Sequence, residues 1–480
     1  MLDGAAETTF VDLQDAFVRT GFERELLCVR GQLGQACPLE IGGERILTAQ
    51  RLLARNPSAN EEVVAEVSMG DARLLVRGLD AAKAAAANWK RQSFTDRARY
   101  LLRAAAFLRQ RQTMLSAWIC LGTGMTWAES TQETRRAVAS LEACGQRALR
   151  LGEGVTVTYL GTDDHEQRYI PLGVGVVLAD DRQSFAQTVA QAAAAMAAGN
   201  TVVLIPAVQT AVTASKWLEV MRLAGLPDGV LNLVPAASLH DAAAVAKSHA
   251  KFVLPQGSSW KDTVVVDEQA AVEEAAQQIV RAAFGWAGQA PGACARVIAH
   301  EAVYEDLTDR LVELTQQLVV GDAADARTQM GPLVGDAARE AAAVHLAACA
   351  RQGRLLYGGR SVGAQGWFME PAIVGDLDAN AQPVASDVQG PVLLLTEAPD
   401  FAAAVAMANQ AGNGQVASVF SDERSHLEDA MERLDALHLF VNQTCSQQMA
   451  QAWTESAWGG PDMRTLMRRR AVWERLAEKR

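Results

Sequence analysis

The stretch GVGVVLADDRQSFAQTVAQAAAAMAAGNTVVLIPA, residues 173–207, decides the fold. Its first apolar run, Val174–Leu178, is continuous, which is typical of a strand buried on both faces of a sheet. Residues Ser184–Ala198 have the composition of a buried helix, and a Gly-Asn pair then supplies a C-cap. Because Thr201–Ile205 is a second buried strand, the stretch predicts a strand–helix–strand unit with parallel strands.

The same alternation continues toward the C-terminus. The helix Thr210–Ala224 and the strand Val230–Val234 extend the first unit. After the strand at residues 263–267, the helix Ala270–Trp286 and the strand Arg296–His300 begin a second unit. The fold class predicted from this order is α/β, with two doubly wound α/β domains.

The segments outside these two units are predicted to be mostly helical. Residues 38–47 indicate two strands around a Gly-Gly turn, and three helices are expected over Gly70–Lys90, Phe94–Thr113 and Met114–Gly152. The alternation of apolar and polar residues in GVTVTYL, residues 154–160, favours a hairpin strand with one face in water.

Composition narrows the class of protein. The chain has 480 residues, a net charge of -12 and 49% hydrophobic residues, as expected for a soluble protein of more than one domain. An acidic surface disfavours nucleic acid and anionic membrane as partners. Seven scattered cysteines without a CxxC pair, and no signal peptide or membrane span, indicate reduced thiols in the cytoplasm. Dispersed histidines give no reason to expect a metal.

Nine segments in order give the chain a family likeness. It resembles the NAD(P)-dependent aldehyde dehydrogenase superfamily, and within it the L-glutamate γ-semialdehyde (1-pyrroline-5-carboxylate) dehydrogenase branch. The segments are PLEIGGERI, YIPLGVGVVL, AAGNTVVLIPA, AGLPDGVLNLVP, KDTVVVDE, AFGWAGQ, VGDAADARTQMGPL, GWFMEPAIVGDLD and GGPDM.

The resemblance implies an aldehyde-dehydrogenase-like architecture of two α/β domains and a β-hairpin oligomerisation arm. It further implies an oligomer, built from copies of this chain or with an aldehyde-dehydrogenase-type subunit. The expected parts are an N-terminal helical lead (1–37), a Rossmann-like cofactor-type domain (38–150 and 173–258), a catalytic-type α/β domain (259–444) and the arm (151–172 with 445–480).

The loop GWAGQAPGACARV, residues 285–297, lacks the nucleophile that the resemblance predicts. The family pattern places a cysteine two residues after Gly-Gln, and Pro291 stands there. Proline has neither a nucleophilic side chain nor a backbone N–H. Cys294 matches a second cysteine of the branch, so we expect it to be a small packing thiol. The alternative is a displaced nucleophile at Cys294.

The other catalytic groups implied by the resemblance are also missing. Arg182 stands at the position of the oxyanion-binding Asn, beside Asp180 and Asp181, with which it is expected to pair. The segment that carries the general base is interpreted as deleted between Lys251 and Lys261, where no carboxylate occurs.

The positions that the resemblance assigns to cofactor binding also carry other residues. Ile205 replaces a ribose-binding Lys, and the helix that would face the pyrophosphate belongs to the deleted part. Asp387 stands where relatives have a ribose-binding Glu, and Gln389 replaces a Phe. The remnant cofactor candidates are Pro206, Gly257, Ser258 and Asp387.

These losses favour a pseudoenzyme, a non-catalytic aldehyde-dehydrogenase-like protein that acts through oligomerisation and is not expected to need a cofactor. The alternative is an NAD(P)-dependent aldehyde or L-glutamate γ-semialdehyde dehydrogenase that uses Cys294 and NAD. A third hypothesis, another enzyme class using Arg182, Asp180 and Asp181, has no support from residues at a diagnostic spacing.

Overall fold

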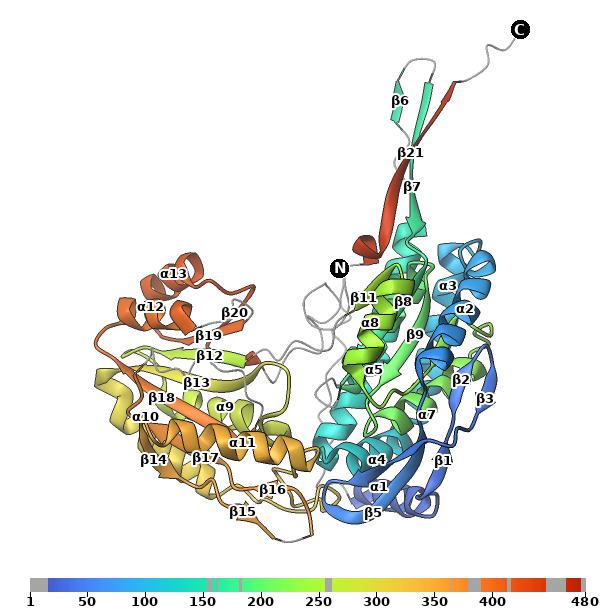
Figure 1. The fold of residues 1–480 in the computed structure, drawn as a ribbon. Coiled ribbons are helices and arrows are strands. Elements are labelled where there is room, and N and C mark those ends of the chain that lie inside the picture. Colours follow the sequence, from blue (N-terminus) through green and yellow to red (C-terminus); the bar gives the residue numbers. More distant parts are fainter. Residues whose placement is uncertain are drawn as a thin grey trace.

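A computed structural model describes residues 16–475, except 153–157, 161–162, 181–183, 255–260, 364, 379–389, 412–415 and 446–462. Two α/β halves lie side by side, and a narrow sheet projects from one of them (Figure 1). The predicted α/β fold class is therefore confirmed. Of the predicted site residues, Asp181, Arg182, Gly257, Ser258, Asp387 and Gln389 lie outside the described residues.

Residues 173–207 form the centre of the first half. Strands β8 (Val174–Ala179) and β9 (Thr201–Pro206) are parallel and fully buried, and helix α6 (Phe185–Ala197) connects them. The hydroxyl of Ser184 accepts the Gln187 N–H at 3.2 Å and caps the helix. The predicted strand–helix–strand unit is confirmed, because the run of apolar residues is buried on both faces as expected.

The sheet of this half has six strands in the order β11-β8-β9-β10-β2-β3. The added strands are β11 (Phe252–Leu254), β10 (Leu231–Leu233), β2 (Leu39–Ile41) and β3 (Glu44–Ile46). A separate three-stranded sheet contains β1 (Gln35–Cys37), β4 (Arg51–Asn56) and β5 (Ala59–Ser68).

The helices that surround the first sheet required one correction to the prediction. The first two predicted helices are present, but the third, Met114–Gly152, is broken at Gly124, which has a φ of 74° and caps α4 in the left-handed region. The observed helices of this half are α1 (Ala16–Arg30), α2 (Ala72–Trp89), α3 (Phe94–Gln110), α4 (Gln112–Thr123), α5 (Trp127–Gly152), α7 (Ala211–Leu223) and α8 (Leu239–His249).

The second half is built on a seven-stranded sheet in the order β14-β17-β18-β13-β12-β19-β20. All of its neighbouring strands are parallel except the antiparallel pair β14–β17. Helices α9 (Val272–Phe284) and α10 (Glu301–Gln316) pack against the sheet through one hydrophobic cluster. Helices α12 (Phe401–Ala411) and α13 (Arg424–Arg433) pack against it through another. The strands are β12 (Lys261–Val266), β13 (Ala293–His300), β14 (Arg354–Tyr357), β17 (Ala372–Gly375), β18 (Val392–Ala398), β19 (Val416–Phe420) and β20 (His438–Val441).

Helices and one tight turn complete this half. They are α9 (Val272–Phe284), α10 (Glu301–Gln316), α11 (Asp336–Cys349), α12 (Phe401–Ala411), α13 (Arg424–Arg433) and the 3₁₀ turn Gly285–Gly288. A two-stranded ribbon of β15 (Ser361–Val362) and β16 (Phe368–Met369) lies beside them. The predicted helix Ala270–Trp286 is thus wrong at its end, since the backbone turns left-handed at Trp286.

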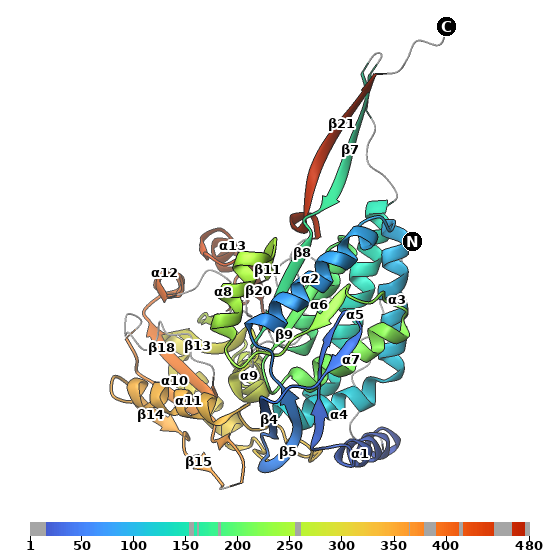
Figure 2. The ribbon, with the colours of Figure 1, turned by 45° about the vertical axis from the view of Figure 1, so that its right-hand side comes forward.

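The third region is a narrow antiparallel sheet that extends away from both halves (Figure 2). Strand β7 (Asp163–Pro171) lies at its centre, between β6 (Thr158–Leu160) and β21 (Met467–Arg475). The pairing of β21 with β7 runs from Met467 opposite Pro171 to Arg475 opposite Asp163. The sheet therefore joins the two segments that the sequence assigns to an arm.

Candidate functional site

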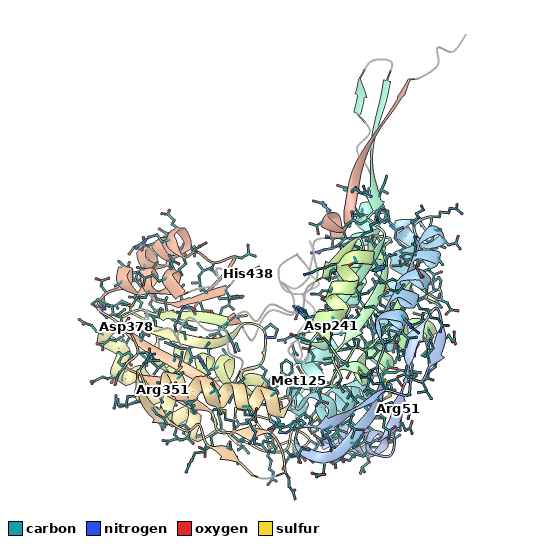
Figure 3. All side chains as sticks on the ribbon, in the orientation of Figure 1. Arg51, Met125, Asp241, Arg351, Asp378 and His438 are labelled. Carbon is teal, nitrogen blue, oxygen red and sulfur yellow. The ribbon has the colours of Figure 1, made fainter. Side chains whose placement is uncertain are left out.

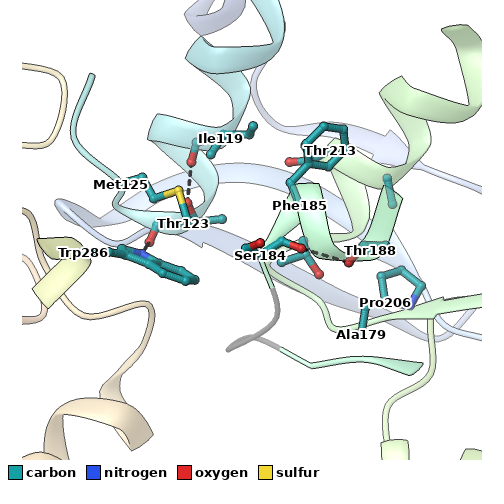
Figure 4. A pocket seen from close by; sticks show the side chains of 12 residues that line it. Ile119, Thr123, Met125, Ala179, Ser184, Phe185, Thr188, Pro206, Thr213 and Trp286 are labelled. Atoms are coloured by element: carbon teal, nitrogen blue, oxygen red, sulfur yellow. Dashed lines mark hydrogen bonds between the residues drawn. The ribbon is translucent and has the colours of Figure 1, made fainter. Parts of the chain in front are cut away.

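The loop that follows helix α9 is held in a strained conformation. Trp286 and Ala287 have φ values of 46° and 51°, a region that side chains rarely adopt. The Trp286 N–H donates to Oε1 of Glu129 at 2.6 Å, and the indole N–H donates to the Thr123 carbonyl at 3.1 Å. The start of the loop is therefore fixed to α5 and α4 of the other half, and Figure 4 shows the bond from Trp286 to Thr123 of α4.

Two further side chains fix the middle of the loop. Gln289 donates to the Trp286 carbonyl at 2.9 Å and accepts the Val334 N–H at 2.9 Å. The buried Lys261 donates its ammonium to the Gly288 carbonyl. These contacts come from segments far apart in the sequence, so the backbone that leads to Pro291 has little freedom to change register.

Cys294 lies in strand β13, which corrects the prediction that it belongs to the loop. The strand begins at Ala293, before the predicted start at Arg296, because Lys261 and Asp262 of β12 pair with Ala293 and Cys294. The Cys294 side chain is 1% exposed, and its thiol donates to the Arg296 carbonyl at 3.6 Å. Pairing with a neighbouring strand thus places the thiol inside the sheet.

The electrostatics around Cys294 oppose formation of a thiolate. Burial raises the pKa of Cys294 well above its usual range, and the nearby carboxyl of Asp262 raises it further. Asp262 is itself fully buried, and burial raises its pKa to about 7 against the hydrogen bonds from Ser418 and the Cys445 N–H. A protonated, enclosed thiol is suited to packing and not to nucleophilic attack.

Cys445 also lies beside the carboxyl group of Asp262. Its side chain is 1% exposed, and its N–H lies 3.5 Å from Oδ2 of Asp262. Burial raises the pKa of this thiol well above its usual range, and Asp262 adds to the effect. This environment is that of a structural thiol.

A small cavity lies at the carboxyl ends of β8 and β9, where an α/β sheet usually binds its ligand. Its volume is about 20 Å³, enough for about one water molecule. Trp286 and Met125 border it on one side, and Ala179 and Pro206 lie together on the other (Figure 4). Arg182, at the position of the oxyanion-binding Asn, lies outside the described residues, and of its two expected partners only Asp180 is described, in a buried position.

Two of the cofactor positions implied by the resemblance, Ile205 and Pro206, are described at this edge. Ile205, at the ribose-binding position, is fully buried in β9. Pro206 ends the same strand and provides no backbone N–H. Sites for ligands of cofactor size have volumes of roughly 300–1,000 Å³. The cavity, at about 20 Å³, is smaller than this range, and its lining is mostly apolar.

The link between the two sheets is short. Strand β11 ends at Leu254 and β12 begins at Lys261, so only residues 255–260 connect them. That length is too small for the helix and the glutamate segment that the resemblance places here, because one helix of ordinary size needs about ten residues.

Sequence reasoning missed the two side chains that fix the loop most directly, Glu129 and Lys261. The fold buries Lys261 and leaves Glu129 half-buried, and loss of solvation raises the pKa of Glu129. Each contacts the loop across a long separation along the chain. The break in the helical pattern at Gly124 is the sequence signal closest to Glu129, since it ends one helix just before the next begins.

Comparison with known proteins identifies the class. The model of the aldehyde dehydrogenase family matches residues 47–260 and 242–461, so the chain belongs to that family. The two matched segments overlap at residues 242–260, which is where the sequence predicts a deletion.

Among the relatives, 1-pyrroline-5-carboxylate dehydrogenases recur. The protein of that name from Bacillus cytotoxicus is 34% identical over 496 aligned positions, which cover 95% of this chain and 96% of the relative. A mutant form of the Thermus thermophilus 1-pyrroline-5-carboxylate dehydrogenase has a TM-score of 0.90 and 28% identity, over 97% of this chain and 98% of that chain. A Thermus structure of the same enzyme with bound NAD matches equally well.

These findings confirm the family resemblance and support the dehydrogenase alternative at the level of the relatives. Two further observations concern the described part of this chain alone. No helix there is long and apolar enough to cross a membrane. Within the same residues, no group of three or more His, Cys, Asp or Glu side chains is arranged to hold a metal ion.

Proposed function

We propose that this protein is a non-catalytic member of the aldehyde dehydrogenase family. The observation that carries the proposal is the pair formed by Pro291 and Cys294. Proline stands where the family pattern places a thiol, and the next thiol is enclosed in strand β13 with a raised pKa. Aldehyde oxidation through a covalent intermediate needs an accessible thiolate, which this arrangement does not supply.

The cofactor edge supports the same proposal. A hydride acceptor must be held beside the reacting carbon, and the cavity of about 20 Å³ next to Ser184 and Trp286 is too small for a nicotinamide. The apolar Ile205 at the ribose-binding position adds no hydrogen bond. We therefore expect neither NAD nor NADP to bind with the affinity of a cofactor.

We propose that the chain acts through assembly, using the projecting sheet of β6, β7 and β21. A sheet of three strands needs a hydrophobic face or packing against another element to be stable, so such an arm gains stability by packing on a partner subunit. The partner would be a second copy of this chain or an aldehyde-dehydrogenase-type subunit.

The second candidate is an NAD-dependent 1-pyrroline-5-carboxylate dehydrogenase with Cys294 as its nucleophile. The names of the relatives and the NAD-bound Thermus structure favour it. It requires the first residues of β13 to leave the sheet, which would break the pairing of Cys294 with Asp262.

Turnover distinguishes the two functions. Purified protein would be mixed with NAD or NADP and with glutamate γ-semialdehyde or a simple aldehyde, and formation of the reduced cofactor recorded. The Thermus enzyme serves as the positive control. We expect no turnover and no saturable cofactor binding by calorimetry. Turnover that disappears in Cys294→Ser would contradict the proposal.

Restoring the thiol tests whether catalytic groups other than the nucleophile have also been lost. In Pro291→Cys the thiol returns to the family position, but the base and the cofactor contacts remain absent, so we expect the variant to stay inactive. Turnover in this variant would mean that only the nucleophile had been lost.

Assembly is tested by light scattering, with Val472→Pro as the variant. Val472 pairs with Glu166 in the arm, and proline removes a ladder donor and is poorly tolerated in a paired strand. We expect an oligomeric mass for the native chain and a smaller mass for the variant. A native monomer that also fails to bind an active family member would contradict the assembly role.

A further inference from the structure

An acidic groove lies near the carboxyl ends of β17 and β18, beside helix α12. Its volume is about 750 Å³, which is in the range of small-molecule sites. Figure 3 shows Asp378 at the outer edge of the second half, well away from Met125 beside the small cavity. The groove is therefore separate from the loop and cavity described above. Its lining combines three carboxylates with apolar side chains: Asp376, Asp378, Glu397, Leu377, Ala403, Ala406 and Met407.

The carboxylates of the groove differ in what they already bind. Asp376 accepts hydrogen bonds from Nε of Arg354 at 2.7 Å and from the Tyr304 hydroxyl at 3.3 Å. Glu397 is exposed, and no ion pair or hydrogen bond of its side chain occurs among the described residues. Asp378 adds a third acidic side chain to the wall. The groove thus keeps negative charge that Arg354 does not neutralise.

A buried hydroxyl group provides an independent indication of a ligand. Thr396 lines the groove and is 2% exposed, yet its Oγ1 has no hydrogen-bond partner in the part of the chain that the structure describes. Such a group costs about 1–3 kcal/mol when it stays unpaired. Because no described protein group satisfies it, a polar atom of a ligand is the expected partner.

The register of the sheet places this hydroxyl on the side of the groove. Thr396 of β18 pairs with Ile298 of β13, and paired residues of neighbouring strands point to the same face. Ile298 packs in the cluster that contains Phe401 and Ala404 of α12. Thr396 therefore faces the α12 side of the sheet, where Ala403, Ala406 and Met407 border the groove.

We propose that this groove binds a linear aliphatic diamine or polyamine. An ammonium group carries the N–H donors that a threonine oxygen can accept and the positive charge that Glu397 attracts. The methylene chain between two ammonium groups would contact Leu377 and Met407. A bare metal ion fits less well, because no group of three or more His, Cys, Asp or Glu side chains among the described residues, the groove carboxylates included, is arranged to hold one. The site is independent of whether the chain is a dehydrogenase.

Calorimetry with 1,4-diaminobutane and spermidine on the full chain tests the proposal. We expect saturable binding that weakens as salt rises, since the partners are charged and partly exposed. Thr396→Val keeps the shape of the side chain and removes the hydroxyl, and we expect it to weaken binding about fivefold. For Glu397→Gln we expect a loss of about tenfold.

A matched control separates the groove from the overall charge of the protein. Glu23→Gln removes the same charge from the exposed surface of α1, in the other half, and should leave the affinity unchanged. Circular dichroism would confirm that each variant is folded. Equal weakening by Glu23→Gln and Glu397→Gln would overturn the proposal, as would the absence of saturable binding. Competition by Mg²⁺ at equal concentration would overturn the choice of an alkylammonium ligand.

Discussion

Replacing Asp262 by Asn should change how the stability of this protein depends on pH. Asp262 is fully buried in β12, between β13 and β19, and Oδ2 accepts the Ser418 hydroxyl at 2.6 Å. Its Oδ1 has no hydrogen-bond partner among the described residues. Because burial disfavours the charged form, the pKa of the carboxyl rises from 3.8 to about 7.

The sign of the effect follows from the raised pKa. Below pH 3.8 the carboxyl is protonated in both the folded and the unfolded chain. As pH rises, the unfolded chain loses this proton first, so the free energy of unfolding falls until the folded carboxyl also ionises near pH 7. At about 1.4 kcal/mol per pH unit, the difference between 3.8 and about 7 corresponds to about 4 kcal/mol.

Urea unfolding between pH 4.5 and 8 measures this contribution. The asparagine side chain of the D262N variant would be neutral throughout, and its amide oxygen can still accept the Ser418 hydroxyl. We therefore expect D262N to gain stability relative to the native chain as pH rises, by up to about 4 kcal/mol near neutral pH. Taking the difference between the two proteins cancels the titration of all other groups. A constant difference across this range would refute the reasoning.

Three other perturbations have defined outcomes. Gly288 has a φ of 68°, and a Cβ there would lie 2.1 Å from a backbone oxygen, so Gly288→Ala should lower the free energy of unfolding by about 3 kcal/mol or more in chemical denaturation. The hydrogen bond to Asp267 raises the pKa of His426, so the stabilising contribution of this pair is present at low pH and is lost as pH rises through that pKa. In His426→Gln, the urea midpoint should no longer show this fall with rising pH. Iodoacetamide should alkylate the exposed Cys28 in the folded protein, and Cys294 only after unfolding. Peptide mass mapping would show which thiol is labelled, and rapid labelling of Cys294 in the native state would contradict its enclosure.

The fold could be predicted from the sequence where the pattern of apolar residues along a short segment determines a strand or a helix. The buried runs that become β8 and β9, and the alanine-rich helix between them, follow from residue types over a few turns. The strands Arg51–Asn56 and Ala59–Ser68 were not predicted, because they carry charged residues and are defined by pairing with each other. Charged side chains thus conceal even this local hairpin from reasoning that relies on the pattern of apolar residues.

Some features of the candidate site are likewise visible in the sequence, and others are not. The replacement at Pro291 is visible in the sequence, because it concerns which residue occupies a motif position. The environment of Cys294 is not visible, since it depends on how β12 pairs with β13. The contact between Glu129 and Trp286 likewise joins two halves of the chain. The residue type at each motif position could be predicted from the sequence, whereas the burial and the pKa of the Cys294 thiol required the structure.

Asp262 also bears on whether Cys294 could act at alkaline pH. Raising the pH is the ordinary way to ionise a buried thiol with a raised pKa, but the neighbouring carboxyl, with its pKa of about 7, ionises first. Once charged, it repels a thiolate through a medium of low dielectric constant. Higher pH therefore adds an opposing charge before it supplies a nucleophile. In this sheet, a pH high enough to favour a thiolate at Cys294 has already ionised Asp262 beside it. This order of ionisation favours a packing role for the thiol.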